Sequence, residues 1–509
     1  MRNKLLLGGL LVSSQWLAAQ DQPNIIVFLV DDMGLMDTSV PFDVDPQGNP
    51  VVRPLNEWYR TPNMERLAKT GIRFSTFYAQ SVSSPSRTSL MTGQNATRHG
   101  TTNWINAESN NRDMYGPRDW NWKGLSAKDF TIPRLLHQAD YKTIHVGKAH
   151  FGCLKSDSVD PTKIGFDVNI AGSAIGHPGS YLGEDGYGNI RGQKARAVPG
   201  LEKYHGKDVF LTEALTREAI AQMDQAIAEK RHFYLNLAHY AVHAPFMSDK
   251  RFAAHYADSD KSKQAQAFAT LIEGMDKSLG DIIDYLEDKG IADNTLIIFM
   301  GDNGGDAPLG PSRGYSSSAP FRGKKGAEFE GGMRVPCIIS WAKPAKRNRF
   351  QKEFPIASDK VNTQLGCIMD IYPTLASLTH TTIPADHPVD GKDLKVMLTG
   401  QHDDSRDNTF LMHFPHNHRG SYFTMYREGD WKIVYYYNPE HSERPECVLY
   451  NLKDDPYEKN EVSEQHPDKT LYMLKQMTAR LEKEGARYPI NFDGATIKPD
   501  ISFFENKFK

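Results

Sequence analysis

The sequence predicts an α/β protein with a large, mixed and mostly parallel sheet sandwiched by helices, followed by a smaller antiparallel sheet with one helix. Continuous apolar runs bounded by turn residues occupy residues 25–30 and 295–300, which is typical of strands buried on both faces. Shorter runs of this kind occur at residues 142–146 and 233–237. Helical patterns separate the runs, and this alternation of strand and helix predicts the sandwich.

The predicted elements before and after about residue 400 differ in type. The expected helices of the first region cover residues 63–70, 131–139, 211–230 and 264–289. After about residue 400, turn residues separate short strand patterns at residues 422–426, 431–437 and 448–452. A helix with one apolar face follows at residues 469–484. We therefore expect a first domain over residues 21–400 and a C-terminal α+β subdomain over residues 401–509.

The composition is that of an ordinary globular protein. The chain has 509 residues, enough for two domains, and 39% of them are hydrophobic, enough for a sizeable core. The formal net charge of -3 gives no bulk attraction to nucleic acid or to acidic membrane surfaces. We expect no nucleic-acid partner, and any anion site must come from a local arrangement of residues.

The N-terminus has the pattern of a secretory signal peptide over residues 1–20. Arg2 and Lys4 supply positive charge, residues 5–12 are largely apolar, and Ala18 and Ala19 are small residues suited to cleavage. A membrane anchor is the alternative, but the apolar run is shorter than the roughly 20 residues that span a bilayer. The segment contains no cysteine for lipid attachment. The sequence therefore predicts a periplasmic or secreted protein without a membrane span.

The cysteines indicate no particular chemistry. They are widely spaced, with no CxxC pair and no zinc-type spacing. One or two disulfides and buried free thiols remain equally open interpretations of Cys153, Cys337, Cys367 and Cys447.

Acidic residues follow the two long apolar runs. Asp31 and Asp32 come directly after residues 25–30, and Asp302 and Asn303 follow the later run. Polar residues just past the carboxyl ends of parallel strands are where such sheets bind ligands. Each pair alone is more often a turn or a helix cap. Together they offer only oxygen ligands, which suit calcium or magnesium and disfavour zinc.

The most specific motif is the segment SSPSRTSLMTG at residues 83–93. It resembles the signature of the sulfatase family, in which a cysteine or serine is followed by any residue and Pro-Ser-Arg, and later by Leu-x-Thr-Gly. In that family the first residue is oxidised to formylglycine, so the resemblance implies formylglycine (3-oxoalanine) at Ser83. It also implies that Arg87 stabilises the formylglycine hydrate, and that a serine-type formylglycine-generating maturase is a partner.

Sulfate-ester chemistry explains why a plain serine is insufficient. Transfer of the sulfuryl group needs an in-line nucleophile, cations for the charged oxygens and neutralisation of the leaving alkoxide. A serine hydroxyl could attack but would leave a stable sulfate ester. A geminal diol avoids this outcome, because loss of a proton from its second hydroxyl expels sulfate.

The resemblance also implies the metal site. In the family, three Asp ligands, an Asn and the formylglycine surround calcium. Here these positions are Asp31, Asp32, Asp302, Asn303 and Ser83. Magnesium is the less expected ion. The metal would polarise a sulfate oxygen and lower the pKa of the diol.

Three further blocks resemble family motifs. Residues 147–152 read GKAHFG, which implies that Lys148 binds sulfate and that His150 orients or deprotonates the diol. Residues 241–245 read AVHAP, which implies His243 as the acid that protonates the leaving oxygen. Residues 322–336 contain the last block, which implies sulfate binding by Lys325. Ala149 and Val242 depart from the family pattern, where an aromatic residue and a proline are usual.

The resemblance covers almost all of the mature chain and implies an alkaline phosphatase-like fold, with residues 21–400 as the catalytic domain. It implies a sulfuric ester hydrolase. By analogy we expect an exo-acting glycan sulfatase that removes O-sulfate from a sulfated saccharide. We expect Trp104, Asn106, Arg313 and His418 to contact the substrate, although each could equally be a packing or rim residue of a loop.

Two alternatives remain. The first is a phosphatase or phosphonate monoester hydrolase of the same superfamily, although a phosphatase normally carries two zinc ions and more His ligands than this set contains. Faster cleavage of a phosphate analogue than of the sulfate ester would favour it. The second is a sulfoglycan-binding protein without activity, which would follow if Ser83 stayed unmodified.

Overall fold

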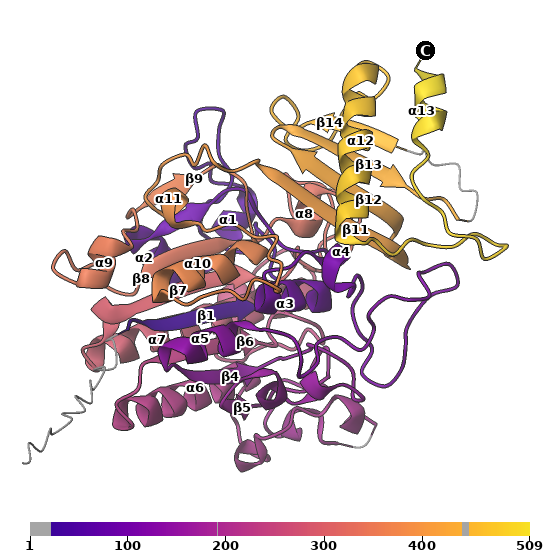
Figure 1. Cartoon of the computed structure of the whole chain (residues 1–509). Helices are drawn as coiled ribbons and strands as arrows, with labels where there is room; N and C mark the ends of the chain where they lie inside the picture. The colour runs from indigo at the N-terminus through magenta and orange to yellow at the C-terminus, as the bar shows by residue number, and fades with distance from the viewer. Residues whose placement is uncertain (1–21, 191, 440–446, 509) are drawn as a thin grey trace, which may run out of the picture.

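The computed structural model describes residues 22–190, 192–439 and 447–508, so the signal peptide expected over residues 1–20 lies outside it. Its main sheet has eight strands, shown in Figure 1. In spatial order these are β5 (Val168–Ile170), β4 (Lys142–Gly147), β6 (Phe233–His239), β1 (Asn24–Val30), β7 (Thr295–Gly301), β8 (Cys337–Trp341), β2 (Ile72–Phe74) and β9 (Lys360–Asn362). Only the two pairs of this sheet that contain β8 are antiparallel. The predicted mixed, mostly parallel sheet is confirmed.

Helices cover both faces of the sheet, as the alternating pattern predicts. Side chains of β1 point alternately to two buried cores, so Val27 lies in one core and Phe28 in the other. The Phe28 core includes side chains of α2 (Pro62–Thr70), α6 (Leu211–Ala228) and α7 (Lys263–Asp288). The Val27 core includes side chains of α3 (Ser83–Thr92), α5 (Ile132–Leu136) and α10 (Ile371–Thr379).

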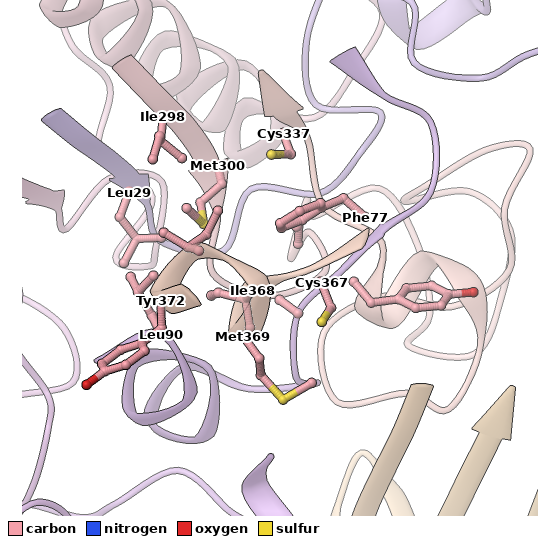
Figure 2. Packing of buried hydrophobic residues seen from close by; sticks show 14 of the residues in the cluster. Leu29, Phe77, Leu90, Ile298, Met300, Cys337, Cys367, Ile368, Met369 and Tyr372 are labelled. Carbon is pink, nitrogen blue, oxygen red and sulfur yellow. The ribbon is translucent and has the colours of Figure 1, made fainter. Parts of the chain in front are cut away.

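The packing of α3 fixes the position of Ser83. Leu90 of α3 lies in the same core as Leu29 of β1, Met300 of β7 and Tyr372 of α10 (Figure 2). This packing holds α3 against the sheet, so that its first residue, Ser83, lies close to the carboxyl ends of β1 and β7. Cys337 and Cys367 lie in this core as buried free thiols, and Cys153 is a free thiol in a smaller cluster.

The C-terminal part forms a second, antiparallel sheet above the first (Figure 1). Its strands are β11 (Thr409–His418), β12 (Gly420–Glu428), β13 (Trp431–Tyr436) and β14 (Cys447–Asn451), in that order. The predicted helix is α12 (Pro467–Glu484), which buries Met473, Leu474, Met477 and Leu481. The sequence patterns predicted three of these strands and missed β11 and the last helix, α13 (Ile501–Lys507).

Short elements complete the fold. They are α1 (Pro54–Trp58), β3 (Phe77–Tyr78), α4 (Ala96–His99), α8 (Glu330–Met333), α9 (Arg349–Glu353), β10 (Gly366–Cys367) and α11 (Lys395–Leu398). Nine one-turn 3₁₀ helices lie between the described elements. Among the helices described, none combines the length and the hydropathy needed to cross a bilayer.

A buried group of charges joins the two sheets. Lys432 of β13 is fully buried, and its Nζ lies 2.9 Å from Glu330 of α8 and 2.6 Å from Glu458. Arg334 lies 2.5 Å from the other oxygen of Glu330. Burial alone would raise the pKa of Glu330, but the charges of Lys432 and Arg334 outweigh it and hold this pKa well below its usual range.

Candidate active site

Four oxygen-bearing side chains meet at the carboxyl edge of the main sheet. The ends of β1 and β7 pair in register, so the residues that follow them emerge side by side. Carboxylate oxygens of Asp31, Asp32 and Asp302 lie within 4.8 Å of one another, and all three side chains are buried. The amide of Asn303 donates to Asp32 at 2.9 Å, which fixes the orientation of its own oxygen.

Ser83 lies against this group. Its Oγ donates at 3.0 Å to Asp31 and is 3.1 Å from the amide oxygen of Asn303. Because Ser83 is the first residue of α3, the free N–H groups and the dipole of the helix favour negative charge near it. The residue is 2% exposed, so its hydroxyl is reached only through the cavity that it lines.

Two lysines supply positive charge to the acidic group beside Ser83. Lys148 follows β4, and its Nζ lies 2.7 Å from Asp31 and 3.2 Å from the Ser83 hydroxyl. Lys325 comes from an irregular loop, and its Nζ lies 2.6 Å from Asp32. Burial opposes the charge of Lys325, but the nearby carboxylates, Asp32 first among them, outweigh it and raise its pKa. Both amines line the cavity and can face a bound anion.

Arg87 lies one turn into α3 and is completely buried beneath these groups. Its Nε donates to Asp302 at 2.9 Å and its Nη1 to the backbone oxygen of Lys148 at 2.7 Å. The guanidinium therefore joins α3 to the ends of β4 and β7, and it fixes the strands that carry the acidic group. Arg87 does not line the cavity.

The acidic group fits a hard divalent cation. Asp31, Asp32, Asp302 and Asn303 offer only oxygen donors, which is the set that calcium and magnesium prefer. Burial, and after it the negative charge of Asp31, raise the pKa of Asp302 above its usual range, so both burial and the neighbouring carboxylate disfavour its charged form. A bound cation would offset the effect of the neighbouring carboxylate. Among the described residues, no histidine or cysteine belongs to this group.

Two histidines border the same space as neutral rings. Nε2 of His150 lies 2.8 Å from the backbone oxygen of Ile105, so this nitrogen carries the proton. Its Nδ1 is buried without a hydrogen-bond partner among the described residues. Nδ1 of His243 donates to the backbone oxygen of Ala244, and its Nε2 lies 3.5 Å from Asp32. Burial, reinforced by the charge of Lys325, lowers the pKa of His243 to about 3.

A cavity of about 310 Å³ opens above Ser83, Lys148 and Lys325. Of the residues expected to contact substrate, Trp104, Asn106 and His418 line this cavity. Arg313 does not line it. Its guanidinium pairs with Glu328 and lies 5.4 Å from the ring of Phe329, outside the cavity wall.

Four polar residues that were not predicted from the sequence also line the cavity: Asp306, Arg419, His177 and Arg196. Asp306 lies four residues after Asp302, and Arg419 directly follows His418. Their closeness in sequence to predicted site residues could have indicated that they belong to the site. His177 stacks on His243 with ring centroids 5.5 Å apart. It lies with Arg196 in a long irregular stretch that carries no motif.

Comparisons with known proteins agree with this geometry. The sequence model of the sulfatase family matches residues 23–381, and the model described as N-sulphoglucosamine sulphohydrolase, C-terminal, matches residues 324–487. The chain is 31% identical over 402 residues to the N-acetylgalactosamine-6-sulfatase of Canis lupus familiaris, which covers 75% of this chain and 67% of that protein. A sulfatase of Formosa agariphila is 28% identical over 547 residues, which cover 95% and 93% of the two chains.

A solved structure shows the same architecture. The crystal structure of Ps i-CgsB in complex with k-i-k-neocarrahexaose is similar to this chain with a TM-score of 0.71 and 25% identity. The match covers 96% of this chain and 98% of that one. The predicted fold class is thus confirmed by this similar structure as well as by the elements themselves. The chain belongs to the sulfatase family, the formylglycine-dependent sulfuric ester hydrolases of the alkaline phosphatase superfamily.

Proposed function

We propose that this sulfatase removes O-sulfate from the end of a sulfated saccharide, with formylglycine made from Ser83 and a calcium ion at the acidic group. One observation carries the proposal. The Ser83 hydroxyl lies at the N-terminus of α3, within 3.2 Å of Asp31, Asn303 and Lys148, at the base of the cavity. A nucleophile, oxygen ligands and a cation are thus within reach of one bound sulfate group.

Different residues bind the sulfate group, position the acidic group and supply the nucleophile. Lys148 and Lys325 bind the sulfate oxygens, together with the N-terminus of α3. Arg87 holds the acidic group and the Lys148 backbone in place. A formylglycine hydrate at position 83 would supply the attacking hydroxyl and a second hydroxyl; loss of a proton from the second would re-form the aldehyde as sulfate leaves. Asp31, Asp32, Asp302 and Asn303 would hold a calcium ion, which would supply positive charge to a sulfate oxygen.

Two histidines are placed to move protons. Nδ1 of His150 has no hydrogen-bond partner among the described residues, and His150 lines the same cavity as Ser83, so its ring offers a proton acceptor there while its bond to Ile105 holds it in place. Nε2 of His243 faces the cavity beside Asp32, where the leaving oxygen of the ester would lie. The negative charge of a bound ester favours protonation of this ring, which supports a role of His243 as the acid.

The cavity and the relatives support a saccharide end as substrate. A cavity of about 310 Å³ is at the small end of ligand sites, which favours one ring rather than a continuous chain. Two of the relatives are a sulfatase named for N-acetylgalactosamine and a protein crystallised with a carrageenan oligosaccharide. The signal-like N-terminus supports a periplasmic or secreted location, and a serine-type maturase is the implied partner.

The mass of the peptide that contains Ser83 tests this proposal. Chain made together with a serine-type maturase should lose the mass of two hydrogens at this residue, and chain made without it should not. Only the first preparation should cleave 4-nitrophenyl sulfate and a sulfated monosaccharide. Protein that carries the aldehyde and cleaves no sulfate ester would contradict the proposal. Chain that keeps plain Ser83 even when it is made with the maturase would support the binding-protein alternative.

Substitution of His243 by alanine should affect saccharide esters more than aryl esters. A sugar alkoxide is a poor leaving group that needs a proton, whereas 4-nitrophenolate leaves without one. We expect kcat for the saccharide to fall by about 10²-fold or more, and kcat for 4-nitrophenyl sulfate to fall at least tenfold less. Steady-state kinetics on both esters measure the difference. Equal losses would show that His243 is not the acid.

Removal of the metal should lower both thermal stability and activity. The oxygen ligands come from the ends of two strands that are far apart in the sequence, so a cation that binds them favours the folded state. At a calcium concentration 100 times the dissociation constant, binding contributes about 2.7 kcal/mol. Differential scanning fluorimetry with a chelator, and then with added calcium or magnesium, measures the effect. An unfolding midpoint that neither treatment changes would contradict the metal assignment.

A further inference from the structure

The cavity wall contains a pair of charged residues that takes no part in binding sulfate or metal. Arg419 and Asp306 both line the cavity. Nη2 of Arg419 donates to Oδ2 of Asp306 at 2.8 Å, and its Nη1 donates to Oδ1, so the pair is bidentate. The side chain of Arg419 is 31% exposed and that of Asp306 is 11% exposed, so each still presents surface to the cavity.

Asp306 is held at a fixed position relative to the sulfate site. Its backbone N–H donates to the backbone oxygen of Asp32 at 3.2 Å. The neighbouring Gly305 accepts a bond at 3.0 Å from the backbone N–H of Lys325. The carboxylate of Asp306 therefore belongs to the same loop framework as the acidic group and the sulfate-binding lysine.

Arg419 is held equally firmly, although it comes from the C-terminal sheet. It occupies the turn between β11 and β12 with a φ of 60°, a conformation that few residues other than glycine adopt. Asp113 fixes this turn by accepting bonds from the N–H of Asn417 at 3.0 Å and from the hydroxyl of Tyr422 at 2.5 Å. The turn thus reaches the cavity as an ordered structure.

Close packing links this turn to the sulfate-binding loop. Gly326 follows Lys325 and has a φ of 82°. A Cβ on this glycine would lie 3.0 Å from the ring of His418 and 3.4 Å from the Cβ of Arg419. Only glycine allows the loop that carries Lys325 to approach the turn this closely. The close packing of this loop against the turn therefore sets the distance from the sulfate site to the Arg419–Asp306 pair.

We propose that Arg419 and Asp306 determine specificity by binding a hydroxyl group of the saccharide ring that carries the sulfate. This inference rests on the proposed function. A sugar hydroxyl both accepts and donates hydrogen bonds, and the pair offers a guanidinium donor beside a carboxylate acceptor. Hydrogen bonds to charged groups discriminate strongly, because an analogue without the hydroxyl leaves them unpaired.

The charges favour a neutral hydroxyl over a second anionic substituent. The carboxylate of Asp306 lies directly against the guanidinium, so an anion bound to Arg419 would also lie beside a negative charge. Nζ of Lys324 lies 3.3 Å from Oδ1 of Asp306, the oxygen that also accepts from Nη1 of Arg419, but Lys324 does not line the cavity. The recognised substrate class is therefore a saccharide sulfate whose ring keeps a free hydroxyl at the position that faces this pair.

The alternative is an ion pair that only ties the β11–β12 turn to the catalytic domain. The two roles differ in their dependence on substrate. A purely structural tie would affect every ester alike, whereas a hydroxyl contact affects only substrates that carry the hydroxyl. A cycle that combines a side-chain change with a substrate change separates the two roles.

The experiment uses the fully matured enzyme with Arg419→Gln and Asp306→Asn. Arg217→Gln and Asp404→Asn make the same changes on the surface and serve as matched controls, since their side chains are 52% and 98% exposed. The substrates are a sulfated monosaccharide, its analogues with one ring hydroxyl replaced by hydrogen, and 4-nitrophenyl sulfate. The measured quantity is kcat/KM for each combination, with the unfolding midpoint of each variant.

For the wild-type enzyme we expect one deoxy analogue to lose between about 10-fold and 100-fold in kcat/KM. Arg419→Gln should impose a similar loss on the intact saccharide, at least tenfold greater than its loss on 4-nitrophenyl sulfate. For the sensitive deoxy analogue, Arg419→Gln should lower kcat/KM little further, because the contact between Arg419 and the ring hydroxyl is already absent. The control variants should follow the wild type on all substrates.

Two results would overturn the inference, and they differ from failure of the proposed function. Equal losses by Arg419→Gln on saccharide and aryl esters would assign the pair a structural role. Wild-type indifference to every deoxy analogue would show that no hydroxyl is recognised. By contrast, wild-type cleavage of the aryl ester but of no sulfated saccharide would reject the proposed saccharide substrate itself.

Discussion

Substitution of Ser83 by alanine is expected to abolish turnover and to leave the fold intact. Alanine cannot be oxidised to an aldehyde, so the site keeps its cations and loses its nucleophile. Loss of a nucleophile lowers kcat by about 10⁴-fold or more in enzymes of comparable mechanism. The lost hydroxyl bonds to Asp31 and Asn303 contribute about 1 kcal/mol each, which a chain of this size tolerates. Kinetics on 4-nitrophenyl sulfate and thermal unfolding measure the two effects.

Two further variants control this experiment. Ser89→Ala removes a buried hydroxyl from the same helix, where it contacts His99 rather than the acidic group, and it should keep most of the activity. Ser83→Cys introduces the other residue that the family converts, and its activity should depend on which type of maturase is present. Residual turnover by Ser83→Ala above a few per cent would mean that another group is the nucleophile.

The largest expected effect on stability is that of Lys432→Met. The change removes the cation that Glu330 and Glu458 share. Arg334 still pairs with Glu330, so it is chiefly Glu458 that is left buried without its charge partner. Removing one partner of a buried ion pair costs about 3–5 kcal/mol, because the remaining charge is uncompensated. Urea unfolding followed by fluorescence and circular dichroism measures this loss, and the C-terminal sheet that carries Lys432 should unfold first.

Lys475→Met is the matched control for this change. Lys475 lies on α12 with its side chain 50% exposed, and its pair with Glu505 should contribute less than about 1 kcal/mol. Adding Glu458→Gln to Lys432→Met removes one of the repelling carboxylates and should recover part of the lost stability. A loss below about 1 kcal/mol for Lys432→Met would show that the network does not hold the two sheets together.

The sequence predicted the elements with strong local signals. The strands β1, β4, β6 and β7 are buried on both faces, so their apolar runs are continuous. In the long helices α6 and α7, apolar residues recur with the spacing of a helix. β2 and β9 have three residues each, too few for any period, and they form only because β8 and each other supply partners. β11 contains Pro415 and an irregular register between Phe414 and Asn417, which conceals the alternation typical of a strand.

The same contrast between local sequence signals and tertiary contacts explains which site residues could be predicted. The residues around Ser83 follow strand ends or lie in compact motifs, so their positions could be predicted from the sequence. The cavity wall depends on long loops and on a turn from the second sheet. Arg313 shows the limit of such prediction, because its segment is rich in polar residues but its side chain pairs with buried Glu328. Arg419 reaches the cavity only through tertiary packing against Gly326.

The burial of Ser83 bears on the order of events during biosynthesis. In the folded protein this residue is 2% exposed, and its neighbours in α3 are buried as well. A maturase acting on the folded protein would have only the active-site cavity of about 310 Å³ through which to reach the Ser83 side chain. If Ser83 is oxidised as we propose, the burial of α3 favours oxidation before the chain folds. A molecule that folded with plain Ser83 would then stay inactive.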